Sequence, residues 1–277
     1  MQYLVESALL VHGIKNVSEE TILRYWDLPD APFVWMEKGM VRIGGIDKLM
    51  DFRRRMRESG IIPRRANHFN LDEYMSLGAD AVMTASGAMS VCAIEGFGAA
   101  VTAGTGGFFP EILADNGTHL TTRGFGPPDV ATLTQVPVVL VSSGPKDMLD
   151  YAGTIRYLDE HSVFVCGTKR PSYSGYVFVG EEAQLPHMLE EHQGTPPNWS
   201  RLHAAFVINE IDADKRLTDR SILEEAVAYG HEAEKAGGYF HPAVNEKLEE
   251  LTKGYSALLQ LAGLLDNAKL IRGIKEV

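Results

Sequence analysis

The sequence predicts an α/β protein, a layered α/β/α sandwich in which helices cover both faces of a central sheet and further helices follow at the C-terminal end. Strand-like and helix-like patterns alternate through most of the chain, and such alternation is typical of a sheet covered by helices. The last third is purely helical in pattern, and no linker divides the 277 residues. We therefore expect one α/β domain over residues 1–277, with a helical C-terminal part from about residue 218.

The individual elements follow from short apolar runs and helical periodicities, taken in chain order. The expected strands are 3–11, 33–36, 41–43, 81–84, 99–103, 138–141, 163–166, 176–179 and 204–208. The expected helices are 18–26, 46–59, 71–78, 88–96, 130–135, 147–160 and 181–192, followed by 219–235, 242–253 and 256–273. Pro242 is expected to open the helix 242–253, because proline suits the first position of a helix.

Composition and charge exclude several classes of function. The net charge is -11 and the pI is near 5.3, so no broad basic surface is available for nucleic acid or anionic lipid. The chain shows no signal-peptide pattern and no apolar run long enough to cross a membrane, which predicts a cytoplasmic protein. Cys92 and Cys166 lie in separate apolar runs, and we expect both to be buried free thiols.

Lys146 is the first candidate for chemistry. It lies between the expected strand 138–141 and the expected helix 147–160. A cation at the positive end of a helix dipole has a lowered pKa. The resulting free amine attacks carbonyl carbons and forms Schiff bases. On position alone, a surface lysine that points away from the helix axis is an equal alternative.

Two carboxylates are candidates for acid and base catalysis. Glu6 lies among apolar residues of the first expected strand, where a carboxylate is costly unless it is paired or functional. Asp129 follows two prolines, and a cap of the helix 130–135 explains it equally well. If both lie near Lys146, they form an acid/base pair around a nucleophilic amine.

Two turns between strands and helices are candidates for ligand binding. Thr84 and Ser86 follow one strand, and their hydroxyl and N–H groups suit an oxyanion or phosphate, although an ordinary N-cap explains Ser86 as well. The sequence G-T-G-G at 104–107 follows the next strand. This turn is a weak signal, because tight turns use the same residues.

Five stretches of the chain resemble motifs of one known family. Residues 6–13 (E-S-A-L-L-V-H-G) resemble E-S-T-I-I-x-H-G, and residues 101–107 (V-T-A-G-T-G-G) resemble A-T-G-G-I-G-G. Asp129 with residues 137–150 resembles A-D-L…P-V-x-V-V-x-A-G-x-K-S-I-L-D, and residues 154–159 are similar to T-L-E-Y-L-E. Residues 266–270 (D-N-A-K-L) are similar to N-N-A-R-L. The family is that of the pseudouridine-5′-phosphate glycosidases, also called the indigoidine synthase A-like family.

The resemblance implies a fold, an activity and a set of site residues. It implies the sandwich of that family, a homo-oligomer that is a trimer, and a sugar phosphate or C-nucleotide as the small-molecule partner. Lys146 aligns with the lysine that forms an imine with C1 of ring-opened ribose 5-phosphate. Asp129 aligns with the neighbouring acid/base, and Glu6 with the acid/base that opens the ring. Substrate and phosphate binding is expected at Arg65, Thr84, Ser86, Thr102, Gly106, Gly107 and Gln260.

The chain departs from the family pattern around the metal and the nucleobase. Phe125 stands where the family has the aspartate that binds manganese, so no metal or other cofactor is expected. Phe109 replaces a histidine and Pro127 a serine. Arg65 replaces a lysine, which keeps the charge but changes the geometry in which an anion is held. Gln260 replaces an asparagine, and the family's acidic loop is shortened here to residues 168–174.

The sequence therefore predicts an enzyme that cleaves, or forms, a ribosyl-phosphate C-glycoside such as pseudouridine 5′-phosphate through an imine on Lys146. The first alternative is the same chemistry on another sugar conjugate or in the synthetic direction. The second is a homologue that binds a sugar phosphate without catalysis. The joint presence of Glu6, Asp129 and Lys146 favours an enzyme, because a buried acid and a depressed lysine are costly without a function.

Overall fold

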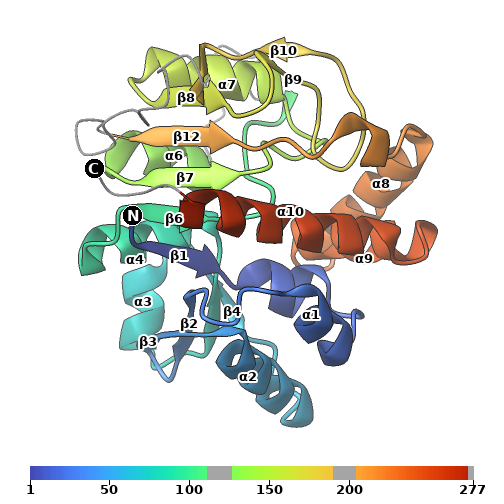
Figure 1. The fold of residues 1–277 in the computed structure, drawn as a ribbon. Coiled ribbons are helices and arrows are strands. Elements are labelled where there is room, and N and C mark those ends of the chain that lie inside the picture. Colours follow the sequence, from blue (N-terminus) through green and yellow to red (C-terminus); the bar gives the residue numbers. More distant parts are fainter. Residues whose placement is uncertain (111–126, 190–203, 274–277) are drawn as a thin grey trace.

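A sheet of ten strands forms the centre of the computed structural model, which describes residues 1–110, 127–189 and 204–273 (Figure 1). The strand order is β11-β8-β12-β7-β6-β1-β2-β5-β4, and β3 pairs with β2. The strands are β1 Tyr3–Glu6, β2 Phe33–Glu37, β3 Met40–Gly44, β4 Arg64–Ala66, β5 Ala81–Met83, β6 Ala99–Val101, β7 Val139–Ser142, β8 Phe164–Gly167, β11 His187–Met188 and β12 Ala205–Ile208. Pairing is parallel throughout except where β2 meets β3 and β5.

Two apolar cores lie on opposite faces of this sheet. Alternate residues of β1 divide between them, with Val5 in one core and Leu4 in the other, as expected because successive side chains of a strand point to opposite faces. One core is covered by α1 Glu19–Tyr25, α2 Ile46–Glu58, α8 Ser221–Lys235, α9 Phe240–Leu251 and α10 Tyr255–Gly273. The other is covered by α3 Leu71–Ser76, α4 Ala85–Glu95, α6 Pro128–Gln135 and α7 Tyr151–Glu160. The predicted α/β/α sandwich is therefore correct.

Three C-terminal helices complete the molecule, as predicted. The helix α10 crosses the front of the sheet over β6 and β7 in Figure 1, and α8 and α9 pack against each other beside it. The α9 helix begins at Phe240, so Pro242 is its third residue and not its first. None of the helices in the described ranges is long and apolar enough to cross a membrane.

The first expected strand is too long, and its true end matters for the site. β1 stops at Glu6, and residues Leu9–Gly13 form a short π-helix, η1. The Glu6 carboxyl accepts a hydrogen bond from the Leu9 N–H. The Ser7 N–H donates to the carbonyl of Met83 at the end of β5. The N–H groups of Ser7 and Leu9 therefore bind Met83 and Glu6, and the chain leaves the strand direction after Glu6.

The β1 and β5 strands approach each other end to end along one edge of β2. β1 pairs in parallel with Phe33 and Val34, whereas β5 pairs antiparallel with Trp35 and Met36. The C-terminal end of β5 therefore meets that of β1. Sequence analysis did not predict this antiparallel insertion, nor the strand β4, which has no apolar run.

Two other expectations about elements are wrong. Residues 176–179 form only an isolated bridge, between Phe178 and Leu217, because the N–H groups of Tyr176, Val177 and Phe178 donate to the Asp147 carboxylate. No helix is present over the described residues 181–188, which hold β10 Ala183–Gln184 and β11; β10 pairs with β9 Ser172–Tyr173 in a small second sheet.

The helix expected at 147–160 begins only at Tyr151, and Asp150 caps it by accepting a hydrogen bond from the Gly153 N–H. The helix expected at 88–96 begins earlier, at Ala85, with Thr84 as its N-cap. The hydroxyl of Thr84, and not that of Ser86, thus provides the cap. Both cysteines are buried and free as predicted, and burial raises the pKa of each thiol to about 12.

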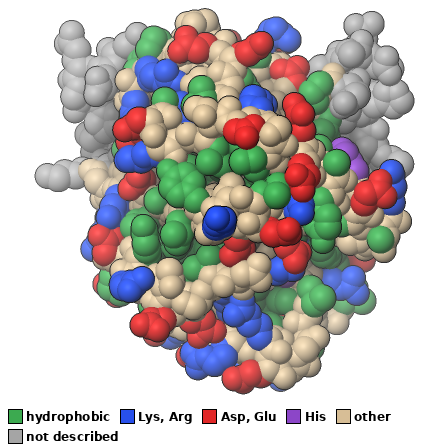
Figure 2. All heavy atoms as spheres, turned by 90° about the vertical axis from the view of Figure 1, so that its right-hand side faces the viewer, with side chains coloured by type: hydrophobic (Ala, Val, Ile, Leu, Met, Phe, Trp, Pro, Cys, Tyr) green, Lys and Arg blue, Asp and Glu red, His purple; other side chains and the backbone are tan. Residues whose placement is uncertain are grey.

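Charged side chains of both signs are interspersed on the face drawn in Figure 2, around a central group of hydrophobic side chains. That face carries no broad basic patch. This distribution agrees with the acidic composition, which argued against a nucleic-acid surface.

Candidate active site

A cavity of about 430 Å³ lies where strands from both halves of the sheet end. All ten residues that the sequence singled out for catalysis or binding line it: Glu6, Arg65, Thr84, Ser86, Thr102, Gly106, Gly107, Asp129, Lys146 and Gln260. β1, β6 and β7 run parallel, so their carboxyl ends meet at one edge of the sheet, where ligands bind in open α/β folds. Glu6 ends β1, Thr102 follows β6, and Lys146 lies in the loop after β7.

Glu6 is a buried carboxyl whose proton is exchangeable near neutral pH. Its side chain is 4% exposed, and burial raises its pKa to about 7 against the opposing effects of the Leu9 N–H and the charges of Arg65 and Lys146. The Thr102 hydroxyl lies 3.5 Å from the other carboxyl oxygen. A group with this pKa gives or takes a proton at physiological pH.

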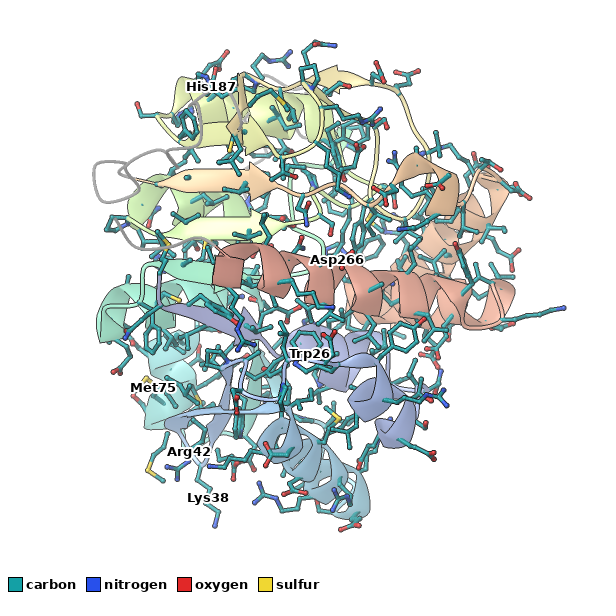
Figure 3. The ribbon with its side chains drawn as sticks, viewed as in Figure 1. Trp26, Lys38, Arg42, Met75, His187 and Asp266 are labelled. Atoms are coloured by element: carbon teal, nitrogen blue, oxygen red, sulfur yellow. The ribbon has the colours of Figure 1, made fainter. Side chains whose placement is uncertain are left out.

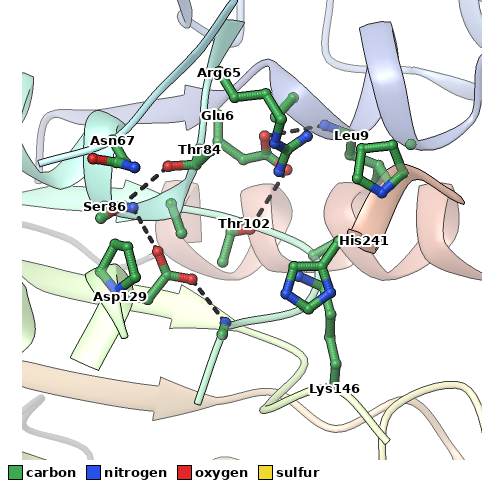
Figure 4. A pocket seen from close by; sticks show the side chains of 18 of the residues that line it. Glu6, Leu9, Arg65, Asn67, Thr84, Ser86, Thr102, Asp129, Lys146 and His241 are labelled. Carbon is green, nitrogen blue, oxygen red and sulfur yellow. Dashed lines mark hydrogen bonds between the residues drawn. The ribbon is translucent and has the colours of Figure 1, made fainter. Parts of the chain in front are cut away.

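Asp129 is held by two backbone N–H groups from different elements (Figure 4). The Ser86 N–H, in the first turn of α4, donates to one carboxylate oxygen at 3.0 Å, and the Gly106 N–H donates to the other at 2.7 Å. Asp129 itself lies in the first turn of α6. The Ser86 N–H at the start of α4 therefore binds the Asp129 carboxylate. It is not free to bind a phosphate, which was the expectation from the sequence.

Lys146 reaches into the cavity from a loop, and the helix-dipole argument for it is wrong. The α7 helix begins at Tyr151, and the Lys146 N–H donates to the Thr105 carbonyl. The pKa of Lys146 is nevertheless lowered, first by burial and further by the charge of Arg65, while Asp129 and Glu6 oppose the shift. The predicted direction therefore holds with a different physical cause.

The neighbouring Asp147 fixes this loop. Its carboxylate is 6% exposed and accepts three backbone N–H groups from residues 176–178. Burial raises its pKa to about 6. Tyr176, which is held in this way, lines the cavity, and its hydroxyl lies 3.4 Å from the Gln260 side-chain oxygen.

Arg65 lies in β4, between the exposed Arg64 and the buried Ala66. Its guanidinium is close enough to Glu6 and Asp129 for both carboxyls to favour its charged form, although burial lowers its pKa. Figure 4 shows Arg65 above Glu6 on the side of the cavity that faces η1. Its side chain lines the cavity and is not a solvated surface residue.

The glycines of the turn 104–107 are required by close approaches. A Cβ on Gly104 would lie 2.6 Å from the Tyr176 ring, and one on Gly107 would lie 2.7 Å from the Thr154 hydroxyl. A Cβ on Gly106 would lie 3.0 Å from an oxygen of Asp129. The turn is therefore packed closely against Tyr176, Asp129 and Thr154.

The C-terminal motif 266–270 supports the site from α10. The Asn267 side chain donates to the Thr102 carbonyl at 2.8 Å and to the Ser143 hydroxyl at 3.1 Å. It thereby ties the end of β6 to the loop after β7. Asn267 is fully buried and does not line the cavity.

One wall of the cavity was missed by the sequence analysis. Tyr239, His241, Pro242 and Asn245 line it from the start of α9, and Asn67 lines it from the loop after β4. No pattern could have indicated this wall, because a histidine and an asparagine near a helix start have many ordinary uses. Only the fold brings α9 over the end of β1.

Like Arg65 and Gln260, two other positions that depart from the family pattern, Phe109 and Pro127, line the cavity. The Phe109 ring contacts that of Phe240 edge-on, with centroids 5.6 Å apart. Phe125 lies outside the described residues. Within the described residues, no three His, Cys, Asp or Glu side chains gather as a metal site would require.

Residues 32–274 match the family described as indigoidine synthase A like protein. The chain belongs to this family. Similar members include proteins named pseudouridine-5′-phosphate glycosidase from Thermus thermophilus, 23% identical over 96% of this chain and 93% of theirs, and from Petrotoga mobilis, 24% identical over 96% and 88%. A third, from Gemmatimonas aurantiaca, is 24% identical over 79% and 71%. The predicted family and the expectation of a glycosidase-like enzyme are thus confirmed.

Two solved structures of similar proteins confirm the fold. One is an indigoidine synthase A-like protein from Thermotoga maritima, with a TM-score of 0.76 and 20% identity over 97% of this chain and 90% of that one. The other is the prealnumycin C-glycosynthase AlnA in complex with ribulose 5-phosphate, with a TM-score of 0.72 and 18% identity over 97% and 88%.

Proposed function

We propose that this member of the indigoidine synthase A-like family cleaves or forms the carbon–carbon bond between a ribosyl phosphate and a nucleobase through an imine on Lys146. Pseudouridine 5′-phosphate is the proposed substrate, as the names of the similar proteins suggest. The observation that carries the proposal is one cavity that holds an amine of lowered pKa, a carboxyl of pKa about 7 and a carboxylate fixed by two N–H groups.

The chemistry begins at the sugar ring. A C-glycoside has no good leaving group, so the sugar must first be opened. Glu6 gives a proton to the ring oxygen as the C1–O bond breaks, which its raised pKa permits near neutral pH. The Lys146 nitrogen then forms a bond to C1.

The carbon–carbon bond breaks in the second half of the reaction. As the Lys146 nitrogen bonds to C1, the Asp129 carboxylate takes the proton that this nitrogen loses. Asp129 then delivers that proton to the base carbon, which keeps the electron pair of its broken bond to C1, while the nitrogen lone pair forms the Lys146 imine of the sugar phosphate. Addition of water to the imine releases the aldehyde and the free amine. The reverse sequence forms the same bond, so the synthetic direction uses the same three residues.

Arg65 is proposed to bind the phosphate of the substrate. It lines the same cavity as Lys146, and a guanidinium grips phosphate oxygens in a bidentate manner. Thr84 and Ser86 contribute hydroxyls on the same side, which lie 3.1 Å from each other. Thr102, Gly106, Gly107 and Gln260 are proposed to contact the sugar or the base.

A direct assay tests this function. The protein is incubated with pseudouridine 5′-phosphate, and uracil and ribose 5-phosphate are quantified by chromatography. Turnover by the parent chain and its loss in Lys146→Arg, which keeps the cation but cannot form a productive imine, are expected. Equal activity of parent and variant would rule out the imine, and no turnover in either direction would favour another sugar conjugate or a binding protein.

A further inference from the structure

The wall of the cavity formed by α9 carries two polar side chains that the proposed chemistry does not use. His241 and Asn245 both line the cavity, and they are four residues apart, which places them on one face of the helix. The His241 Nδ1 is buried and has no hydrogen-bond partner among the described residues. Buried polar atoms in proteins are nearly always paired, so this nitrogen requires an explanation.

Packing holds this wall in a fixed position. Phe240 and Val244, which flank the two polar residues on α9, are buried in the core. On the other side, α9 contacts η1 at Gly13, where a Cβ would lie 3.0 Å from the Asn245 side-chain nitrogen and 2.9 Å from Leu9. The imidazole and the amide therefore face the cavity from a rigid support.

The charge state of this wall differs from that of the sheet edge. Burial lowers the pKa of His241 well below its usual value, and the charges of Lys146 and Arg65 lower it further. Figure 4 shows the imidazole beside the Lys146 side chain. A neutral imidazole offers one donor and one acceptor, and an asparagine amide offers both as well.

We propose that His241 and Asn245 form the subsite that recognises the uncharged heterocycle released from the sugar. The neutral donors and acceptors match a ring edge that carries adjacent N–H and C=O groups, as a nucleobase does. The charged groups Arg65, Glu6, Asp129 and Lys146 remain on the sheet edge for the sugar phosphate. This inference rests on the proposed function, because it names the part of the substrate that is released from C1 beside Lys146.

Two variants test the subsite with the full chain. His241→Phe and Asn245→Leu keep the size of each side chain and remove its hydrogen bonds, and His187→Phe is the control. His187 stacks on Phe164 at the far edge of the sheet (Figure 3). Borohydride trapping of ribose 5-phosphate on Lys146 is expected to stay within about twofold of the parent in all three variants. The kcat/KM for pseudouridine 5′-phosphate is expected to fall about tenfold or more in the two α9 variants only, the size of one lost hydrogen bond.

A binding measurement separates this inference from the proposed function. The 15N signals of His241, assigned by their loss in His241→Phe, are followed while uracil is added to the parent chain. A saturable shift supports the subsite even if neither trapping nor turnover is found. The subsite is overturned if uracil leaves these signals unchanged, or if the α9 variants lose trapping and kcat/KM to the same extent.

Discussion

Glu6 makes the stability of the folded chain depend on pH. Its pKa is about 7 in the folded state and near 4.5 when exposed, so the folded chain binds more protons between these values. The stabilisation is therefore complete below pH 4.5 and is lost as the pH rises through 7. Glu6→Gln lacks this dependence. The free energy of unfolding of Glu6→Gln minus that of the parent should therefore increase by roughly 2–3 kcal/mol from about pH 5 to about pH 8.

Urea unfolding of the two chains at several pH values measures this difference. Asp147, whose pKa is also raised, is present in both and cancels in the comparison. A difference that does not change with pH would show that the Glu6 carboxyl is ionised in the folded state.

Arg65 provides a second test at the level of one residue. Arg65→Ala should raise KM for a phosphorylated sugar by about tenfold or more, because a charge-assisted hydrogen bond is worth roughly 1.5–3 kcal/mol. Arg64→Ala is the matched control, since Arg64 precedes it in β4 and is exposed. Kinetics with phosphorylated and unphosphorylated sugars decide the matter. The assignment of Arg65 to the phosphate fails if Arg65→Ala has the same KM as the parent for both sugars.

At the scale of elements, the site depends on the contact between the turn 104–107 and the start of α6. Gly106→Ala would place a methyl group 3.0 Å from the Asp129 carboxylate that its own N–H binds. We expect kcat to fall about tenfold or more, because a small displacement of a catalytic group is costly. Gly273→Ala, at a position with no neighbour within 4 Å of the new Cβ, is expected to keep the parent kcat. Equal kcat for both variants would show that Asp129 has no role in the rate-limiting step.

Sequence patterns predicted most elements, but they misplaced the end of β1 and missed β4, both of which carry residues of the site. Buried strands such as β7 and β12 are clear apolar runs and were found within one or two residues. β1 was extended to residue 11 because its apolar run continues into η1, where burial and not strand pairing explains it. β4 was missed because Arg64 and Arg65 are not apolar. Local periodicity does not contain the tertiary contacts that decide these cases.

The same limit applies to the candidate site. Glu6 was identified because a carboxyl is unusual in an apolar run. In the structure it is buried, and burial raises its pKa. The helix-dipole explanation for the lowered pKa of Lys146 was wrong because no helix begins at Asp147. The Asp147 carboxylate instead accepts hydrogen bonds from the N–H groups of residues 176–178. That Glu6, Asp129 and Lys146 share one cavity followed from the family resemblance, since no spacing in the chain implies it.

At the scale of the whole molecule, two expectations stay predictions. One is a single domain over residues 1–277, and the other is a homotrimer.

Figure 3 shows Lys38, Arg42 and Met75 at the end of the molecule formed by β2, β3 and α3. Large apolar side chains are exposed there, with Leu77 69% exposed.

Metal independence is a further prediction for the whole enzyme. The resemblance to the family's motifs aligns Phe125 with a metal-binding aspartate, and hard cations require oxygen ligands. Turnover of pseudouridine 5′-phosphate should therefore survive dialysis against EDTA without loss. Stimulation of the chelated enzyme by manganese would contradict this prediction and would indicate that another carboxylate holds a metal.

The central claim is that Lys146 forms an imine with a sugar phosphate, and one measurement tests it most directly. The chain is incubated with ribose 5-phosphate and borohydride, digested, and mapped by mass spectrometry, with Lys146→Arg and the surface variant Lys269→Arg as controls. The account predicts one reduced adduct, on the peptide that holds Lys146, which Lys269→Arg retains and Lys146→Arg loses. An adduct confined to other lysines, or one that persists in Lys146→Arg, would contradict it.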